Sequence, residues 1–517
     1  MDKKLSLGIE IGSTNIKSVL LDGSHAIVAQ GSYTWENKLI DGVWTYDLDD
    51  VWVGLQASYK NLKSKYEKKL GKLDKIHNIG ISAMMHGYLV FDKNDNQLYP
   101  FKTWRNTDTG PASERLSELF NFNIPLRWSI AHLYQAILND EPHVKDIAYI
   151  TTLAGYVHWK LTGEKTLGIG DASGMFPIDP KTKNYNQSML EDFHNLAGTP
   201  WNISDILPAI KVAGQYAGTL TEKGIKLLDV NADLQPGSIF CPPEGDAGTG
   251  MVATNSIKKK TGNISAGTSV FAMIVLEKEL SKTYKDVDIV TTPSGDNVAM
   301  IHVNNCTSEI NEWVNIFNDF LAAIGGTVSK EQLYEILFKE ALKGDADAGG
   351  ILAYGYLSGE HITKVEHGRP MLIRRPDARL DLSNLMRAQL YSAFATLHIG
   401  MKVLIEQEKV DIDTIVAHGG IFKTKGVADY ILANALNTEV YTMETASEGG
   451  AWGIAVLASY LNASSDQNLE DYLEKEIFGS VPYTKAYPTK HDTQGFNQFV
   501  NLYENSMPLQ IKAGQYI

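Results

Sequence analysis

Two similar stretches, one at the start of each half of the chain, constrain the fold more than any other feature of the sequence. Residues 5–23, LSLGIEIGSTNIKSVLLDG, place a Gly-Ser-Thr turn between two apolar runs. Residues 262–277, GNISAGTSVFAMIVLE, place a Gly-Thr-Ser turn between two more. Each stretch is typical of a β-hairpin whose small polar turn binds phosphate. Duplication of a domain explains the likeness, and chance resemblance of two short hairpins is the alternative.

The length of 517 residues supports two domains, because a single hydrophobic core stops growing at about 250–300 residues. The polar and basic stretch ATNSIKKKTG, residues 253–262, is the natural boundary, so we predict domains of residues 1–253 and 254–517. Segments with the pattern of strands alternate with segments such as the amphipathic helix predicted for residues 47–70. This alternation predicts an α/β architecture.

The composition narrows the class of protein. A net charge of −14 argues against sequence-independent binding of nucleic acid, which depends on Lys and Arg. Cys241 and Cys306 are the only cysteines, too few for a disulfide scaffold or a Cys-ligated metal. We find no signal-peptide pattern after the initial MDKK and no apolar run of about 18 residues. We therefore expect a soluble cytoplasmic protein with no membrane partner.

A third glycine turn occurs late in the chain. In IDTIVAHGGIFKT, residues 412–424, an apolar strand ends at Gly419-Gly420, and residues 425–436 follow with a helical pattern. Paired glycines let a ligand approach the backbone, and the start of a helix offers N–H groups to an anion. An ordinary tight turn is the alternative interpretation.

Three carboxylates are candidates for chemistry. Asp246 lies among small residues in SIFCPPEGDAGTGMVA, an uncrowded setting that suits a group reaching a substrate hydroxyl. Asp171, in GIGDASGMFPID, could equally be the base, although a cap on the Ser173-Gly174 turn is the interpretation that its position favours. Glu10, in the first hairpin, would hold Mg²⁺ directly or through water, since hard cations take oxygen ligands.

Candidate sugar-binding residues follow a predicted buried strand. In SAMMHGYLVFD, Met85 and His86 come directly after that strand, where the histidine could hydrogen-bond a polyol. Trp104 and Arg105 follow in PFKTWRNTDTG, and could cover C–H groups and donate to hydroxyls. The alternatives are a satisfied core histidine and a tryptophan half-buried under a loop.

The order of these motifs identifies a resemblance. GIEIGSTNIKSVLLD, MMHG, EGDAGTG, NISAGTS, YGYLSGEH, AHGG and GGAWGIAVLA occur in the same order as in the FGGY family of carbohydrate kinases. Within that family the chain most resembles the xylulokinase-like, or pentulose kinase, branch. The resemblance implies two actin-like domains of ribonuclease-H type, with the sugar in the cleft between them. It also implies that MgATP is held mainly by the C-terminal domain, and a homodimer is common in the family.

The resemblance also assigns roles to residues. It implies that Asp246, rather than Asp171, is the catalytic base, with Met85 and His86 at the sugar. It implies that phosphates meet the first hairpin at Gly12, Ser13 and Thr14 and the second at Gly267 and Thr268, with Gly420 near the adenosine. We also predict that Lys17 and Lys423 contact the nucleotide or its phosphates.

The chain departs from the family pattern at three places. Glu10 stands where the family usually has Asp, so the metal ligand is one methylene longer. The family's Trp-x-Asp-x-Arg pattern is absent after Trp104, so contacts to the sugar cannot be transferred there. Lys423 and Thr424 stand where small residues are common in the family.

We therefore predict an ATP-dependent kinase with Mg²⁺ as cofactor and a small sugar as substrate. The predicted sugar is a ketopentose, D-xylulose first and L-ribulose second. A polyol or aldonate such as glycerol or gluconate is an alternative, because Arg105 could bind a carboxylate. The rival from another class is an actin-like ATPase switch, which would need no MMHG pocket.

Overall fold

The computed structural model describes residues 4–443 and 449–516. These residues divide into two compact α/β units. Unit 1 consists of the described residues within Met1–Ile257, Asp288–Val298 and Glu448–Val481. Unit 2 consists of those within Lys258–Val287, Ala299–Ser447 and Pro482–Ile517. The first long segment of unit 1 thus ends four residues beyond the boundary predicted after residue 253, and two later segments of the chain return to unit 1.

The main sheet of unit 1 contains the first predicted hairpin. Its strands follow the order β13-β6-β1-β2-β3, and β14 also pairs with β6. Strand β1 is antiparallel to β2 and parallel to β6. These strands are β1 (Ser6–Ile11), β2 (Asn15–Leu21), β3 (Ile27–Thr34), β6 (Asn78–Ala83), β13 (Ile239–Phe240) and β14 (Glu244–Gly245). The parallel register brings the carboxyl ends of β1, β6 and β14 to one edge of the sheet.

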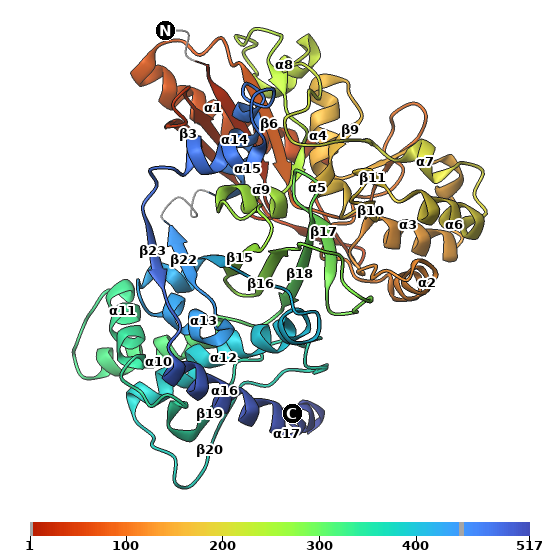
Figure 1. Ribbon diagram of the computed structural model, residues 1–517. Helices are drawn as coiled ribbons and strands as arrows, with labels where there is room; N and C mark the ends of the chain where they lie inside the picture. Colours follow the sequence, from red (N-terminus) through yellow and green to blue (C-terminus); the bar gives the residue numbers. More distant parts are fainter. Residues whose placement is uncertain (1–3, 444–448, 517) are drawn as a thin grey trace. The chain divides into compact units, whose positions relative to one another are not determined.

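Two helices cover this sheet on opposite faces (Figure 1). Ser18 of β2 shares a 2.7 Å hydrogen bond with Ser58 of α1 (Leu48–Leu70), so α1 lies on the face that carries Ile9 and Ile11. On the other face α14 (Gly449–Tyr460) is buried over residues 450–460. Because side chains alternate along a strand, Gly8 and Glu10 both point to the α14 face.

Two glycines let α14 approach the sheet. Gly8 and Gly80 are paired in β1 and β6. A Cβ at Gly8 would lie 2.2 Å from the carbonyl oxygen of Ala451, and one at Gly80 would lie 2.6 Å from Ile454 Cγ1. A side chain at either position would therefore collide with α14.

Gly8→Ala is expected to lower the free energy of unfolding by about 1–3 kcal/mol, because its methyl group meets backbone atoms of α14 that cannot yield without moving the helix. Urea unfolding measures the effect. Gly23→Ala is the matched control, since a Cβ there has nothing within 4 Å, and it should stay within about 0.5 kcal/mol of wild type. Equal unfolding curves for both variants would show that α14 does not pack on Gly8.

Unit 1 also contains the following strands and helices. The further strands are β4 (Lys38–Ile40), β5 (Val43–Thr45), β7 (Leu89–Phe91), β8 (Tyr149–Thr151), β9 (Thr166–Gly168), β10 (Ile178–Asp179), β11 (Asn184–Tyr185), β12 (Ala209–Lys211) and β17 (Asp288–Thr291). The further helices are α2 (Gly110–Phe120), α3 (Ser129–Leu138), α4 (Leu153–Thr162), α5 (Ile169–Ala172), α6 (Gln187–Ala197), α7 (Ile203–Ile206), α8 (Glu222–Leu228), α9 (Asp246–Ala253) and α15 (Leu469–Tyr472).

Unit 2 contains the second predicted hairpin. Strands follow one another there in the order β16-β15-β21-β22-β23, with β15 antiparallel to β16 and parallel to β21. The strands are β15 (Thr261–Ala266), β16 (Val270–Val275), β18 (Asn297–Val303), β19 (Ile351–Tyr354), β20 (Met371–Arg374), β21 (Thr414–His418), β22 (Val440–Met443) and β23 (Tyr483–Ala486). The helices are α10 (Ser308–Ala323), α11 (Lys330–Ala341), α12 (Leu382–Lys402), α13 (Ala428–Leu436), α16 (Lys490–Asn505) and α17 (Met507–Tyr516).

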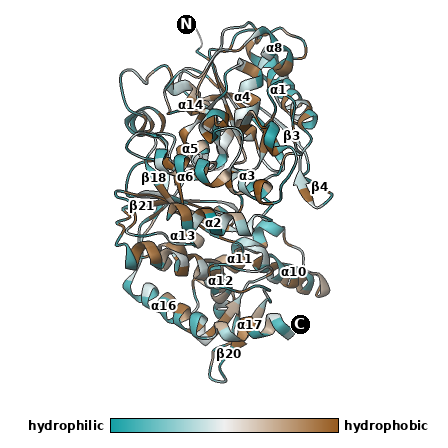
Figure 2. Ribbon diagram, turned by 90° about the vertical axis from the view of Figure 1, so that its right-hand side faces the viewer, coloured by the Kyte–Doolittle hydropathy of each residue, from teal (hydrophilic) through white to brown (hydrophobic). Residues whose placement is uncertain are grey.

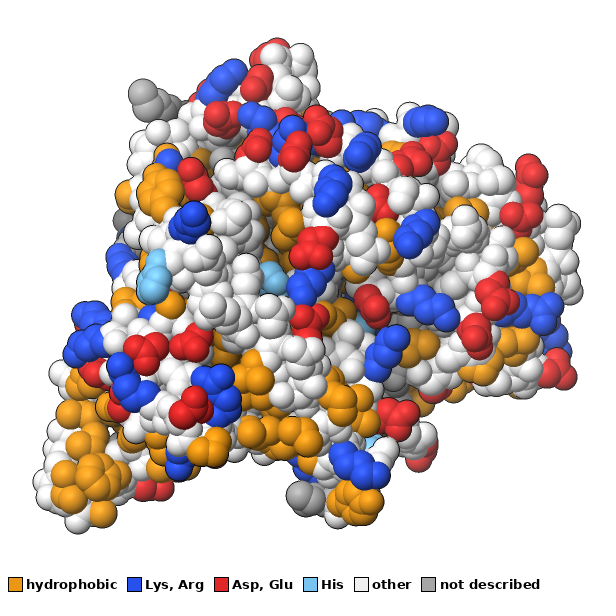
Figure 3. Space-filling model, turned by 60° about the horizontal axis from the view of Figure 1, so that its bottom comes forward, with side chains coloured by type: hydrophobic (Ala, Val, Ile, Leu, Met, Phe, Trp, Pro, Cys, Tyr) orange, Lys and Arg blue, Asp and Glu red, His pale blue; other side chains and the backbone are white. Residues whose placement is uncertain are grey.

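The two hairpins, the α/β alternation and the helix predicted for residues 47–70 are confirmed. Hydrophobic and hydrophilic residues are mixed along the helices in Figure 2, as one-sided burial requires. On the face drawn in Figure 3, acidic and basic side chains are interspersed rather than separated into patches. None of the helices in the described residues is both long and apolar enough to cross a membrane.

Candidate active site

Asp246 lies at the edge of the first sheet, where it begins helix α9. Strand β14 pairs with the end of β6, and this pairing brings Asp246 to the segment that follows β6. The backbone N–H of Met85 donates to Asp246 Oδ1 at 3.2 Å, and that of Ala247 donates at 3.0 Å. Asp246 is exposed to solvent, yet burial among protein atoms raises the pKa of its carboxyl group, against the effect of these N–H donors. Sequence positions 85 and 246 therefore meet in one site.

His86 has a backbone conformation that few residues other than glycine adopt. Its φ is 69°, and Gly87 follows with a φ of 93°. The ring is buried, and Nδ1 lies 3.2 Å from the carbonyl oxygen of Gly174. Burial and the charge of Arg127 lower the pKa of His86 to about 3. The ring is therefore neutral at pH 7, donates through Nδ1, and keeps Nε2 as an acceptor.

The first glycine turn is held by aromatic side chains. Trp35 Nε1 donates to the carbonyl oxygen of Gly12 at 2.8 Å, and the Tyr46 hydroxyl donates to that of Ser13 at 2.6 Å. The indole N–H of Trp104 reaches Ser13 Oγ at 3.3 Å. Because the carbonyl groups of Gly12 and Ser13 accept these hydrogen bonds, the side chains of the protein itself hold the turn in shape.

Glu10 and Asp246 carry negative charge close to each other. Glu10 Oε2 accepts the N–H of Ala451 at the start of α14, at 3.3 Å, and Lys17 is its partner across the hairpin. Burial raises the pKa of Glu10, the charge of Asp246 raises it further, and Lys17 opposes both. A divalent cation bound by the Glu10 carboxylate would offset this repulsion, since hard cations take oxygen ligands.

Trp104 and Arg105 lie beside the first glycine turn, in unit 1, rather than deep in the protein. Both side chains are exposed. The Arg105 guanidinium stacks 3.9 Å from the centre of the Trp44 ring. Trp104 therefore contacts Ser13, and the ring of Trp44 supports the guanidinium of Arg105 through a cation–π contact.

The second glycine turn and the third lie side by side in unit 2. Strands β15 and β21 are parallel, so the turns after them lie at the same sheet edge. Gly419 has a φ of 118°, and a Cβ there would lie 2.0 Å from the carbonyl oxygen of Ala266. Only glycine permits that approach. Gly267 and Thr268 thus lie beside the turn that leads through Gly420 to Lys423.

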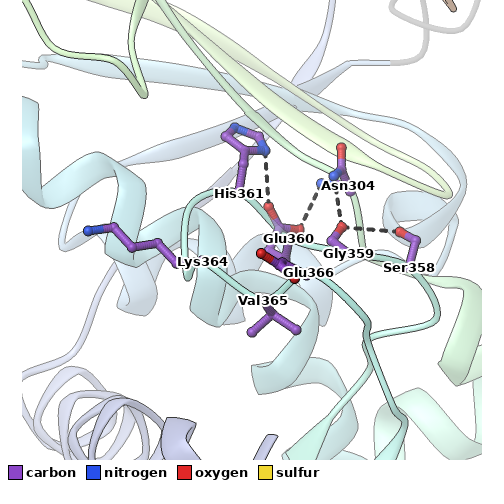
Figure 4. Close-up of a pocket in the computed structure, with 8 residues that line it drawn as sticks. All are labelled: Asn304, Ser358, Gly359, Glu360, His361, Lys364, Val365 and Glu366. Atoms are coloured by element: carbon purple, nitrogen blue, oxygen red, sulfur yellow. Dashed lines mark hydrogen bonds and ion pairs between the residues drawn. The ribbon is translucent and has the colours of Figure 1, made fainter. Parts of the chain in front are cut away.

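The loop that contains Glu360, to which the sequence analysis assigned no role, supports the second glycine turn. The side chain of Glu360, from the motif YGYLSGEH, is buried at a hollow of about 530 Å³. Its Oε2 accepts the N–H of Asn304 at 2.9 Å, and its Oε1 faces His361 Nδ1 at 3.5 Å (Figure 4). The same Oε2 also accepts the N–H of Asn305 at 3.3 Å. Thr307, two residues after Asn305, donates its hydroxyl to the carbonyl oxygen of Gly267 at 2.7 Å. The contacts of Glu360 thus hold the segment that supports the second glycine turn.

Asp171 differs from the interpretation that its sequence position favoured. Its side chain does not cap the Ser173-Gly174 turn, because Thr152 Oγ1 donates to Asp171 Oδ2 at 2.6 Å and Oδ1 finds no hydrogen-bond partner among the described residues. Burial raises the pKa of Asp171 to about 8. The predicted cap was wrong because the fold buries Asp171 against Thr152, directly after β8. The local sequence does not reveal this contact.

Comparison with known proteins places the chain in a class. The FGGY family of carbohydrate kinases matches through its N-terminal domain at residues 5–234 and its C-terminal domain at residues 262–461. The protein is a carbohydrate kinase with the two-domain α/β fold of that class. The chain belongs to the FGGY family.

Individual relatives are distant. A xylulose kinase of Haemophilus influenzae is 23% identical over 521 residues, which cover 96% of this chain and 98% of the relative. The gluconate kinase structure from Lactobacillus acidophilus has a TM-score of 0.80 at 17% identity and covers 100% of both chains. The ligand-bound xylulose kinase structure from the same organism has a TM-score of 0.79 at 17% identity and covers 99% of both chains. The fold is therefore common to kinases with different sugars in their names.

Proposed function

We propose that this carbohydrate kinase transfers the γ-phosphoryl group of ATP to a ketopentose, D-xylulose before L-ribulose. The observation that carries the proposal is the hydrogen bond from the Met85 N–H to Asp246. It joins the candidate base to the segment that carries His86. One site therefore offers both a base for the sugar hydroxyl that accepts the phosphoryl group and a ring that can bind the sugar. An ATPase switch has no need for this arrangement.

Asp246 is the proposed general base. Its carboxylate is exposed to solvent and fixed by two N–H donors, so it can accept the proton of the attacking hydroxyl. The neutral His86 ring orients the open-chain sugar through its Nε2 acceptor. The turns at Gly12-Ser13-Thr14 and Gly267-Thr268 are the proposed phosphate contacts, with Lys17, Gly420 and Lys423 at the nucleotide. Positioning and electrostatics then supply most of the rate, as in other phosphoryl transfers.

Glu10 is the proposed ligand of Mg²⁺. When bound, the ion would neutralise charge on the phosphates. The fit rests on the carboxylate of Glu10, whose repulsion by the charge of Asp246 a bound cation would offset. Lys17, the partner of Glu10 across the hairpin, opposes the same repulsion. Here the longer side chain of Glu10, compared with the usual Asp, also receives the Ala451 N–H.

Glu10→Gln is expected to raise the Mg²⁺ concentration needed for half-maximal activity while leaving sugar KM nearly unchanged, because the amide keeps the shape and removes the charge. Magnesium titrations of the two proteins at saturating sugar measure this. Glu36→Gln is the matched control in an exposed loop of the same unit. An unchanged titration for Glu10→Gln would make Glu10 a structural residue that only anchors α14.

The substrate is tested by kcat/KM for D-xylulose, L-ribulose, glycerol and gluconate in one assay of ADP release. A ketopentose should give the highest value. Gluconate is the alternative with a specific observation behind it, since Arg105 is exposed and supported by Trp44 and one relative of similar fold carries gluconate in its name. A tenfold preference for gluconate or glycerol would reject the ketopentose and leave the kinase intact.

A further inference from the structure

A second pair of carboxyl groups lies directly behind Asp246. Asp171 and Glu244 are both buried, with exposed fractions of 0% and 1%. Glycines make room for the Glu244 carboxylate, because a Cβ at Gly168 would lie 2.3 Å from Oε1 and one at Gly170 would lie 2.5 Å from Oε2. The GIGD sequence, residues 168–171, is thus a cradle for Glu244.

The two carboxyl groups receive different numbers of hydrogen bonds. Glu244 accepts the N–H of Gly170 at 3.3 Å on Oε1 and that of Asp171 at 2.9 Å on Oε2. Asp171 accepts one hydroxyl, from Thr152, and its Oδ1 lacks a partner within residues 4–443 and 449–516. A buried carboxylate with few donors is costly to ionise, and donors to both oxygens favour the charged form. Burial raises the pKa of both Asp171 and Glu244 to about 8, so the difference in hydrogen-bond donors decides where the proton lies. The donors place the charge on Glu244 and the proton on Asp171.

The pair touches the residues that hold the candidate base. A Cβ at Gly245, the residue before Asp246, would lie 2.1 Å from Met85 Cγ and 3.1 Å from Asp171 Oδ1. Gly245 is therefore fixed between Met85 on one side and Asp171 on the other. Asp171 and Glu244 therefore lie against the residue that precedes Asp246 in the chain.

We propose that Asp171 and Glu244 form a buried acid–carboxylate pair, with the proton on Asp171 and the charge on Glu244, and that this pair positions Asp246. The inference rests on the proposed function of Asp246 as the base. Neither residue touches the sugar, so both are positioning residues. The proton on Asp171 also limits the negative charge behind Asp246, which must itself be ionised to accept a proton.

The groups that face the pair can be named. Asp246 on α9 and Tyr185 on β11 interact with the charge of Asp171, and Cys241 interacts with that of Glu244. Asp288 on β17, the strand beside α5, is paired with Arg127. Tyr185 and Cys241 stay neutral near pH 7, since burial raises the pKa of both well above it.

Amide substitutions at the two positions test the assignment. Asp171→Asn replaces a neutral acid by a neutral amide, so kcat/KM at pH 7 should stay within about threefold of wild type. Glu244→Gln removes the charge and turns an NH₂ group toward an N–H donor, so kcat should fall about tenfold or more while sugar KM changes by less than about threefold. The exposed Glu222→Gln is the matched control.

The pH profile separates positioning from general structure. Burial raises the pKa of Asp171 to about 8, so wild-type kcat/KM should fall above that pH as a second charge appears behind Asp246. Asp171→Asn should lack this fall. A loss of kcat in Asp171→Asn with none in Glu244→Gln would mean that Asp171 carries the charge and Glu244 the proton. Equal losses in the two variants would show that the two carboxyl groups do not differ in charge.

Infrared spectroscopy tests the proton without relying on turnover or on Glu244→Gln folding. At pH 7 the C=O absorption of buried carboxylic acids in the wild type should lose one component in Asp171→Asn, because other buried carboxyl groups also have raised pKa values. An identical carboxylic-acid absorption in the two proteins would overturn the proposal directly. If the absorption changes as expected while Asp246→Asn keeps full activity, the proton is on Asp171 as proposed, and the assignment of Asp246 as the base is wrong.

Discussion

Asp246→Asn should lower kcat by about 10²–10⁴-fold, the usual contribution of a positioned general base, with a much smaller change in sugar KM. Asn keeps an acceptor for the Met85 N–H, so the site should retain its geometry, but the amide cannot take the proton of the sugar hydroxyl. Steady-state kinetics measure the loss, and circular dichroism checks the fold. Half of wild-type turnover in this variant would mean that another group is the base.

The pH dependence of the wild-type enzyme provides a check on the same residue. The base must be ionised, so activity should fall as the pH drops through the pKa of Asp246. Because desolvation by the surrounding protein atoms raises that pKa above the usual value for Asp, the fall should begin at a higher pH than an Asp free in water would give. This acid limb should be missing from the residual activity of Asp246→Asn.

His86→Ala should raise KM for the true sugar by about 5- to 150-fold, since losing one hydrogen-bonding partner in a closed site costs about 1–3 kcal/mol. Its effect on kcat should be smaller, because the base is untouched. His86→Asn is the matched control: Asn tolerates a φ of 69° and keeps an acceptor near the position of the ring. An unchanged sugar KM in His86→Ala would return His86 to the role of a core histidine.

The sequence was sufficient for the parts of the fold that depend on local pattern. Apolar runs around Gly-Ser-Thr and Gly-Thr-Ser predict the two hairpins because strands and tight turns are specified by neighbours in the chain. The third turn, at Gly419-Gly420, was predicted for the same reason. Met85, His86 and Asp246 were proposed separately, and the parallel pairing of β14 with β6 is what joins them.

Other parts depend on contacts between distant residues, which local pattern does not reveal. Gly8 and Gly80 lie in strands that read as ordinary apolar runs, and only the packing of α14 explains them. Glu244 stands two residues before Asp246 in the sequence, and only the structure shows that residues 168–171 enclose its carboxylate. Glu360 belongs to a quoted motif, but its support of the second turn through residues 304–307 required the structure.

The most direct test of a sugar kinase against an ATPase switch is a count of products by phosphorus NMR, with ATP and Mg²⁺ in the presence and absence of D-xylulose. With Asp246 serving as base for a sugar hydroxyl, each ADP should be matched by one sugar phosphate, and ADP release should be slow without the sugar. ADP appearing at the same rate with and without sugar, across D-xylulose, L-ribulose, glycerol and gluconate, with no sugar phosphate formed, would rule that reaction out.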